Sequence, residues 1–190
     1  MNKIGVLALQ GCIDPHLKIL EKCGVTPLKV RSIEELGACD GLILPGGESS
    51  TMLKIIERNS LTHALTQFIA NKPVWGICAG AILLAEDVHK PSQFSFKKIK
   101  VRATRNHYGS QLDSFKAEIE IPLLSHKMTL DFIRAPHLER LSDDVQVLAT
   151  HNNDQVILRD KDCLLSSCHP ELGDDYRLHS YFIDIVNRQI

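Results

Sequence analysis

Cys78 is the residue whose surroundings most suggest chemistry. It lies in the stretch GICAG, between an apolar run and a helix-like segment, with Gly76 and Gly80 two residues away on either side. A nucleophile on a sharp turn from strand to helix needs small neighbours, because the backbone is strained there and the thiol must face a cleft. The start of the helix would favour a thiolate, and the N–H of Ala79 could donate to an oxyanion. The alternative is that Cys78 is a small buried hydrophobic residue.

A nucleophilic thiol needs a base, and His169 is the best candidate for it. This histidine lies in SSCHPEL, with Glu171 two residues further on and Pro170 expected to hold an extended turn between them. If both side chains face the same edge of a sheet, Glu171 can accept a hydrogen bond from one imidazole nitrogen while the other nitrogen faces Cys78. By itself the tripeptide also suits a solvated turn. The other histidines have no such partner in the sequence and are expected at surface or capping positions.

Two consecutive glycines mark a third candidate, the stretch LPGGESS. Gly46 and Gly47 follow an apolar run, so the backbone N–H groups there could approach a ligand closely, as an oxyanion hole or a carboxylate cradle requires. The alternative is a plain tight turn.

A parallel α/β sheet would bring these stretches together. Three apolar runs, at 3–9, 41–44 and 73–77, are each followed by a turn and a helix-like segment. That order is typical of parallel strands joined by helical crossovers, with ligands bound at the carboxyl ends of the strands. A further short strand is predicted at 26–30. The helices are expected at 14–24, at 80–88 and after residue 48, with Ser49 or Ser50 as the N-cap of the last of these.

The sequence between residues 93 and 167 has a different texture, with short alternating stretches and few helices between them. We interpret these stretches as the strands of an antiparallel or mixed half. They lie at 94–104, 115–121, 131–136, 145–151, 155–160 and 163–168. The last segment, 174–189, spaces Leu178, Phe182, Ile185 and Val186 like the buried stripe of a closing helix. Because no repeat, low-complexity tract or linker separates the two halves, a single domain is expected over residues 1–190.

Composition narrows the classes of partner and compartment. The chain has 190 residues, 44% of them hydrophobic, and a formal net charge of −1, with charges of both signs interspersed. It can therefore bury one sizeable core, and neither nucleic acid nor a membrane surface is an expected partner. No run suits a signal peptide or a membrane span, which favours the cytoplasm. The six cysteines are accordingly expected as free thiols, and without a C-x-x-C pair no metal site is expected.

Taken together and in this order, P-G-G-E-S, G-x-C-A-G and H-P-E resemble the class I, triad-type glutamine amidotransferases. Additional blocks make the chain similar to one branch of them, the glutaminase subunits of pyridoxal 5′-phosphate synthase. The blocks are LALQG at 7–11, LPGGESST at 44–51, ICAGAILLA at 77–85, RNHYGSQLDSF at 105–115, FIRAP at 132–136 and CHPELGDDYRLHSYF at 168–182.

This resemblance implies a three-layer, flavodoxin-like fold and a role for each matching residue. Cys78 would be the nucleophile, with His169 and Glu171 completing the triad, and the N–H groups of Gly47 and Ala79 would form the oxyanion hole. An arginine suits the α-carboxylate of glutamine because its fork can bind both oxygens. The glutamine-binding residues that the resemblance implies are Gly46, Gly47, Glu48, Arg105, Ile133 and Arg134.

The resemblance also implies a reaction and a partner. Glutamine would be hydrolysed to glutamate and ammonia through a thioester, and the ammonia would pass to a barrel-shaped synthase subunit in a complex of twelve copies of each. That subunit would make pyridoxal 5′-phosphate from ribose 5-phosphate and glyceraldehyde 3-phosphate, so pyridoxal phosphate is a product of the complex, and no cofactor is expected in this subunit.

Two residues depart from the family pattern. Pro15 precedes His16 where the family commonly has Glu-His, and a proline in the first turn of a helix should cause a local change only. Cys168 replaces a common phenylalanine and is expected to point away from His169. The alternatives to this assignment are a glutaminase subunit of another synthase, for example in histidine biosynthesis, a thiol peptidase or stress-sensing thiol of related fold, and a binding module with a vestigial site.

Overall fold

Parallel strands form one half of a mixed central sheet. The computed structural model describes residues 2–105, 114–124 and 126–188. The parallel strands are β1 (Lys3–Leu7), β2 (Thr26–Val30), β3 (Gly41–Leu44), β4 (Val74–Ile77) and β12 (Cys163–Ser166). Their spatial order is β2-β1-β3-β4-β12, which is the flavodoxin-like order once β12 is counted as the fifth strand. The late strand β12 thus lies directly beside β4.

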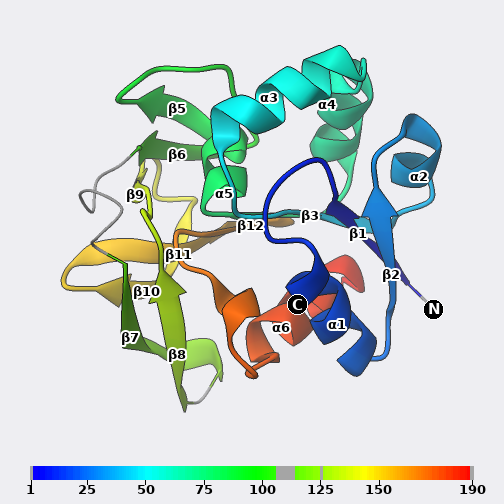
Figure 1. The fold of residues 1–190 in the computed structure, drawn as a ribbon. Helices are drawn as coiled ribbons and strands as arrows, with labels where there is room; N and C mark the ends of the chain where they lie inside the picture. Colours follow the sequence, from blue (N-terminus) through cyan, green and yellow to red (C-terminus); the bar gives the residue numbers. More distant parts are fainter. Residues whose placement is uncertain (1, 106–113, 125, 189–190) are drawn as a thin grey trace.

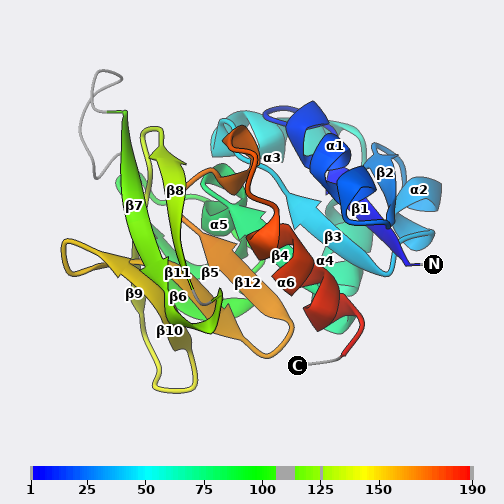
Figure 2. The same ribbon diagram turned by 90° about the horizontal axis from the view of Figure 1, so that it is seen from below.

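Helices cover both faces of this half, so the protein has three layers (Figures 1 and 2). On one face lie α2 (Ile33–Gly37), α3 (Ser49–Arg58), α4 (Thr62–Asn71) and α5 (Ala79–Leu84). On the other face lie α1 (Asp14–Lys22) and α6 (Arg177–Val186). The predicted stripe of α6 is buried at Leu178, Phe182 and Ile185, and half-buried at Val186. The three-layer α/β architecture is therefore confirmed.

The second half of the sheet is mixed, as the short alternating stretches of its sequence predict. The strand β11 (Asp154–Asp160) runs antiparallel to β12 and also pairs with β10 (Gln146–His151) and β9 (His137–Arg140). Beyond β9 lie β6 (Ile99–Thr104) and the parallel edge strand β5 (Ala85–His89). A separate antiparallel pair, β7 (Phe115–Ile121) and β8 (His126–Phe132), packs beneath the sheet as drawn in Figure 1. The 3₁₀ turn η1 (Pro122–Leu124) lies between the two strands in the sequence.

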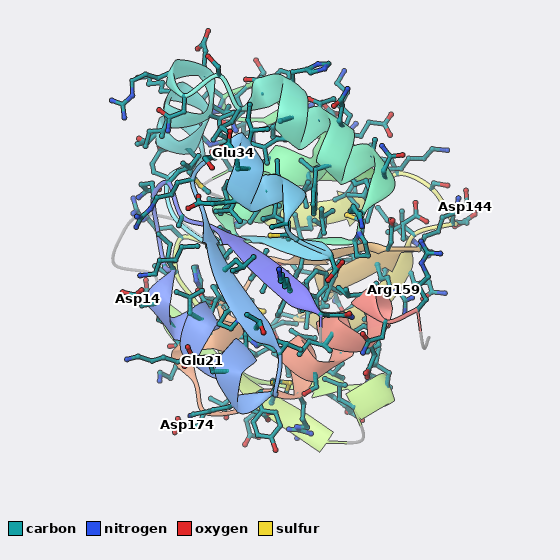
Figure 3. All side chains as sticks on the ribbon, turned by 90° about the vertical axis from the view of Figure 1, so that its right-hand side faces the viewer. Asp14, Glu21, Glu34, Asp144, Arg159 and Asp174 are labelled. Carbon is teal, nitrogen blue, oxygen red and sulfur yellow. The ribbon has the colours of Figure 1, made fainter. Side chains whose placement is uncertain are left out.

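Apolar side chains fill both faces of the sheet. Every residue of β3 and β4 is buried, which is the pattern expected of central parallel strands covered by helices on both sides. One core cluster contains Leu44 and Met52 on the α3 side, and the other contains Trp75 and Phe182 on the α6 side. Charged side chains such as Asp14, Glu21, Asp144 and Asp174 are exposed (Figure 3). Within the described ranges, no helix is long and apolar enough to cross a membrane.

The structure corrects the predicted boundaries in several places. The helix predicted over 80–88 ends at Leu84, because the next five residues pair with β6 as strand β5. The N-cap of α3 is Glu48 rather than Ser49 or Ser50: its carboxylate accepts the N–H groups of Ser50 and Thr51. The predicted strand 131–136 leaves the sheet after residue 132. The predicted strand over 94–104 begins only at Ile99, and neither the helices α2 and α4 nor the strand β9 was predicted.

Candidate active site

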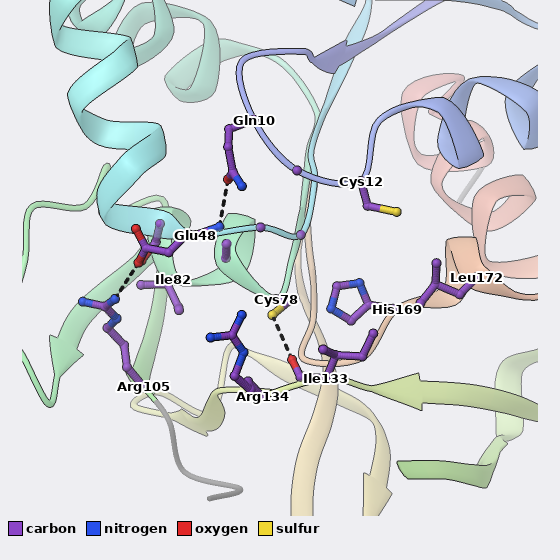
Figure 4. Close-up of a pocket in the computed structure, with 15 residues that line it drawn as sticks. Gln10, Cys12, Glu48, Cys78, Ile82, Arg105, Ile133, Arg134, His169 and Leu172 are labelled. Atoms are coloured by element: carbon purple, nitrogen blue, oxygen red, sulfur yellow. Dashed lines mark hydrogen bonds and ion pairs between the residues drawn. The ribbon is translucent and has the colours of Figure 1, made fainter. Parts of the chain in front are cut away.

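A pocket of about 310 Å³ opens at the carboxyl ends of the parallel strands (Figure 4). Every predicted site residue except Glu171 lines it, and Glu171 lies buried behind His169. The block at 105–115 contributes Arg105, while its residues 106–113 lie outside the described part of the chain. The pocket walls are formed by Gln10, Gly11, Cys12, Gly46, Gly47, Glu48, Ser49, Cys78, Ala79, Ile82, Arg105, Ile133, Arg134, His169 and Leu172.

Cys78 stands on the turn between β4 and α5 in a strained backbone conformation. Its φ is 48° and its ψ is −101°, outside the regions that residues with side chains usually adopt. Two hydrogen bonds hold this turn: the N–H of Cys78 donates to the Ser166 carbonyl of β12 at 2.8 Å, and its carbonyl accepts the Ile82 N–H at 3.2 Å. Cys78 is 7% exposed and lies at the pocket wall, with its sulfur 3.8 Å from the Ile133 carbonyl oxygen. The sharp turn predicted from the GICAG spacing is therefore present.

The glycines around this turn allow unusually close packing of the backbone. A Cβ added at Gly80 would lie 1.9 Å from the Leu44 carbonyl oxygen, and one added at Gly76 would lie 2.6 Å from the carbonyl oxygen of Gly80. The first turn of α5 is thus pressed against the end of β3. Larger residues at these positions would push Cys78 away from the pocket wall.

His169 and Glu171 form a buried hydrogen-bonded pair beside Cys78. The His169 Nδ1 atom is 2.7 Å from Glu171 Oε1, and the two residues are 6% and 3% exposed. The backbone N–H of His169 donates to the Asp131 carbonyl of β8 at 2.8 Å. This hydrogen bond holds the backbone at His169 against the end of β8. Pro170 begins a 3₁₀ turn, η2 (Pro170–Leu172), so the extended turn predicted here is wrong. The tighter turn keeps the carboxylate beneath the imidazole.

The surroundings of His169 favour its charged form. Burial opposes the charge, but interactions with Cys78 and Glu171 outweigh burial and raise the pKa of His169 to about 10. At neutral pH the imidazolium therefore faces the Cys78 sulfur, an arrangement that stabilises a thiolate (Figure 4). The stretch PGG closes over the ring: a Cβ at Gly46 would lie 2.2 Å from His169 Cε1.

Glu48 and Arg105 place opposite charges on another wall of the pocket. Arg105 Nη2 donates to Glu48 Oε1 at 2.9 Å. Partial burial opposes the charge of Glu48, but hydrogen bonds from Ser50 and Thr51 outweigh it and lower the pKa of Glu48 to about 2. This wall therefore presents a negative charge on Glu48 and a positive charge on Arg105. It can bind the ammonium group and the carboxylate of one ligand together.

The comparisons with known proteins agree with this geometry. The model of the SNO glutamine amidotransferase family matches residues 6–188. The chain belongs to this family. A relative from Geobacillus thermodenitrificans, described as pyridoxal 5′-phosphate synthase subunit PdxT, is 43% identical over 185 residues, covering 97% of this chain and 95% of the relative. One from Kosmotoga olearia with the same description is 42% identical over 191 residues, covering 98% of this chain and 100% of the relative.

A solved structure described as a glutamine amidotransferase superposes with a TM-score of 0.90. It is 36% identical to this chain, with 97% of this chain and 98% of the other covered. The class I amidotransferase fold, with its parallel first half and its antiparallel later strands, is therefore shown.

Several pocket residues of this amidotransferase were not predicted. The Gln10 side-chain oxygen accepts the Glu48 N–H at 2.8 Å, and the Cys12 N–H donates to the Gly46 carbonyl at 3.0 Å. Gln10 belongs to the block LALQG at 7–11 and follows the first predicted strand, but no local pattern gave a reason to assign it a role in the site. Among the described residues, no group of three or more histidine, cysteine, aspartate or glutamate side chains could hold a metal ion.

The two departures from the family pattern leave the pocket intact. Pro15 lies in the first turn of α1, as expected. Cys168 is fully buried within the apolar cluster beneath the sheet and does not line the pocket, in agreement with its expected direction. Burial raises the pKa of the Cys168 thiol.

The expectation that the remaining histidines lie at surface or capping positions is wrong for two of them. His16 of α1 and His179 of α6 are fully buried, and His16 Nδ1 is 2.9 Å from His179 Nε2. The reason is tertiary: α1 and α6 cover the same face of the sheet, so two histidines 163 positions apart meet beneath the triad.

Proposed function

We propose that this protein is the glutaminase subunit of pyridoxal 5′-phosphate synthase and hydrolyses L-glutamine to L-glutamate and ammonia. The observation that carries the proposal is the buried His169–Glu171 hydrogen bond, with His169 and Cys78 together at the wall of one pocket. The family and the descriptions of its relatives support the same activity.

The proposed mechanism uses Cys78 as the nucleophile and His169 as the acid and base. The thiolate attacks the side-chain amide carbon of glutamine, and the N–H groups of Gly47 and Ala79 stabilise the oxyanion. The His169 imidazolium then protonates the departing ammonia, which leaves a thioester. A water molecule that gives its proton to His169 hydrolyses the thioester, releasing glutamate and restoring the thiolate. Glu171 orients the imidazole throughout.

The charged wall explains how an α-amino acid would be oriented. We assign the glutamine ammonium group to Glu48 and its carboxylate to Arg105 and Arg134. Arg105 lies against Glu48 at one side of the pocket, and the Arg134 side chain extends toward Cys78 (Figure 4). Gly46 and Ile133 border the path of the side chain toward Cys78. A free amino acid carries both an ammonium group and a carboxylate, whereas a glutamine residue within a peptide chain carries neither. The site therefore favours free glutamine over a protein substrate.

Replacing Arg105 by lysine is expected to raise KM for glutamine about tenfold with little change in kcat, because lysine cannot reproduce a two-pronged contact with a carboxylate. Steady-state kinetics in the complex with the synthase subunit would measure both constants. The control is Arg102→Lys: Arg102 lies in the same strand region but pairs with Asp87 and Glu139 outside the pocket. A fall in kcat at unchanged KM would instead give Arg105 a role in the chemistry.

The partner in this proposal is the synthase subunit that consumes the ammonia. The relatives are described as subunits of pyridoxal 5′-phosphate synthase, which implies a second subunit. We assign to it a barrel enzyme that joins ammonia to ribose 5-phosphate and glyceraldehyde 3-phosphate, in a complex of twelve copies of each chain. None of the six cysteines is in a disulfide, which suits the cytoplasm as the compartment.

A glutaminase assay with and without candidate partners tests this assignment. Glutamate release should rise when the pyridoxal phosphate synthase subunit is added, and pyridoxal phosphate should form from glutamine and the two sugar phosphates. The ammonia-using synthase of histidine biosynthesis is the matched control. Stimulation by that control alone would identify a different pathway. A protein that releases no glutamate in the presence of either synthase would reject the glutaminase assignment.

A further inference from the structure

The buried histidines beneath the triad form a continuous line of polar contacts with Glu171. Glu171 Oε1 is hydrogen-bonded to His169, and its second oxygen, Oε2, lies 3.7 Å from His16 Nε2. The opposite nitrogen of His16 contacts His179 at 2.9 Å. Four side chains therefore follow one another inward from Cys78: His169 at the N-cap of the turn η2, Glu171 within that turn, His16 on α1 and His179 on α6.

Trp75 encloses the inner end of this line. Its ring centroid is 4.9 Å from that of His179 and 6.2 Å from that of His16, both edge to face. The indole N–H donates to Ser166 Oγ at 3.0 Å and so makes no hydrogen bond to either histidine. The histidine pair lies in an apolar enclosure in which each polar contact is strengthened.

Both inner histidines are neutral at physiological pH. Burial lowers the pKa of His179 to about 3, and burial together with the neighbouring His179 and His169 holds the pKa of His16 well below its ordinary value. The titratable groups around Glu171 are His16 on α1, His169 on its own turn, and the thiols of Cys12 and Cys168. Burial and the proximity of Glu171 raise the pKa of Cys12 to about 11, so this thiol is also neutral.

Two neutral imidazoles in contact can distribute their protons in two ways, and only one suits this site. If His179 Nε2 carries the proton, it donates to His16 Nδ1, and the proton of His16 stands on Nε2, facing Glu171 Oε2. In the other arrangement a bare His16 lone pair faces the carboxylate, and the His179 Nδ1–H is buried with no hydrogen-bond partner. An unpaired buried donor and a repulsive contact disfavour the second arrangement.

We infer that His16 is a positioning residue of the glutaminase reaction: its N–H holds Glu171 Oε2 while Oε1 orients His169, and His179 sets the His16 tautomer. The inference deepens the proposed function and rests on it. At 3.7 Å the contact is longer than a hydrogen bond. Catalytic hydrogen bonds commonly shorten once substrate is bound. Glu171 Oε2 is buried and has no partner within normal hydrogen-bond geometry among the described residues. Besides His169 and His16, the Cys12 thiol also interacts with the Glu171 carboxylate.

The first test compares leucine and glutamine at position 16. His16→Leu removes the N–H donor that positions Glu171. In the complex, kcat for glutamine should fall about tenfold with KM unchanged, a loss similar to those seen when a residue that orients a functional side chain is removed. His16→Gln can present an amide N–H at the place of Nε2 and should recover most of the loss. His179→Leu should also lower kcat, because without the hydrogen bond from His179 the proton of His16 is no longer kept on Nε2.

The second test asks whether His16 acts through Glu171. In the Glu171→Gln background, adding His16→Leu should cause less than about a twofold further loss, because the group it positions has already changed. A further tenfold loss in this background would overturn the inference and make His16 a packing residue.

The third test is independent of glutamine. Titration of His169 by NMR in the free subunit should show its pKa falling from about 10 in His16→Leu and returning in His16→Gln, because a loosened Glu171 stabilises the imidazolium less. Leu20→Ala is the matched control: Leu20 lies on the same helix, is fully buried, and should lower the melting temperature without moving this pKa. An unchanged His169 titration in His16→Leu would overturn the inference. A shifted titration in a protein that releases no glutamate would reject the proposed function alone.

Discussion

Replacing Cys78 by alanine is expected to abolish glutamate release from glutamine, with a loss of at least about 10⁴-fold in kcat, because no thioester can form. The fold should persist, since the change removes one small sulfur atom, whose contact with the Ile133 carbonyl at 3.8 Å is weak. In the complex, the variant should still support pyridoxal phosphate synthesis from ammonium chloride while failing with glutamine. A coupled assay with each nitrogen source would measure both outcomes.

Cys168→Ala is the control that separates the nucleophile from a neighbouring thiol. Cys168 is fully buried in the apolar core and does not line the pocket. This variant should lose stability and keep its glutaminase activity. Retained glutamate release by Cys78→Ala would contradict the assignment of the nucleophile.

Replacing Gly80 by alanine is expected to destabilise the protein by about 3 kcal/mol or more. The added Cβ would lie 1.9 Å from the backbone oxygen of Leu44, and backbone cannot move aside as a flexible side chain can. Because β3 and the first turn of α5 are both buried, the strain must be relieved by separating them. Chemical denaturation followed by the fluorescence of Trp75, the single tryptophan, would measure the change in the free energy of unfolding.

Gly37→Ala is the matched control for Gly80→Ala. Gly37 ends the short helix α2, and a Cβ there would meet no atom within 4 Å. Alanine has the higher helix propensity, so this variant should be as stable as the parent or slightly more so. Equal losses at Gly80 and Gly37 would show that close packing at the turn is not the cause.

The parts of the fold that could be predicted are those in which local pattern and tertiary environment agree. The strand Gly41–Leu44 was predicted at its observed limits because it is buried on both faces and bounded by turn residues. The cysteine turn was predictable because Gly76 and Gly80 satisfy a local steric need. Nine of the ten predicted site residues line one pocket, and the tenth, Glu171, supports His169 from behind.

The parts that could not be predicted depend on distant partners. Residues 85–88 continue the predicted helix-like pattern but belong to the strand β5, because β6 pairs with them. Glu48 replaces the serines as N-cap because its carboxylate reaches two backbone N–H groups and meets Arg105 from another strand region. The contact between His16 and Glu171 spans nearly the whole chain, and no local spacing could have indicated it.

The place of β12 beside β4 makes the active site a late product of synthesis. The nucleophile follows β4, whereas its base and the orienting carboxylate follow a strand that begins at Cys163. A nascent chain that has not yet delivered this segment carries a thiol without a base and lacks the hydrogen bond from Cys78 to Ser166 that holds the turn. Contacts between such distant segments form slowly, after the local ones. A chain that ends before this segment therefore lacks the base and cannot hydrolyse glutamine.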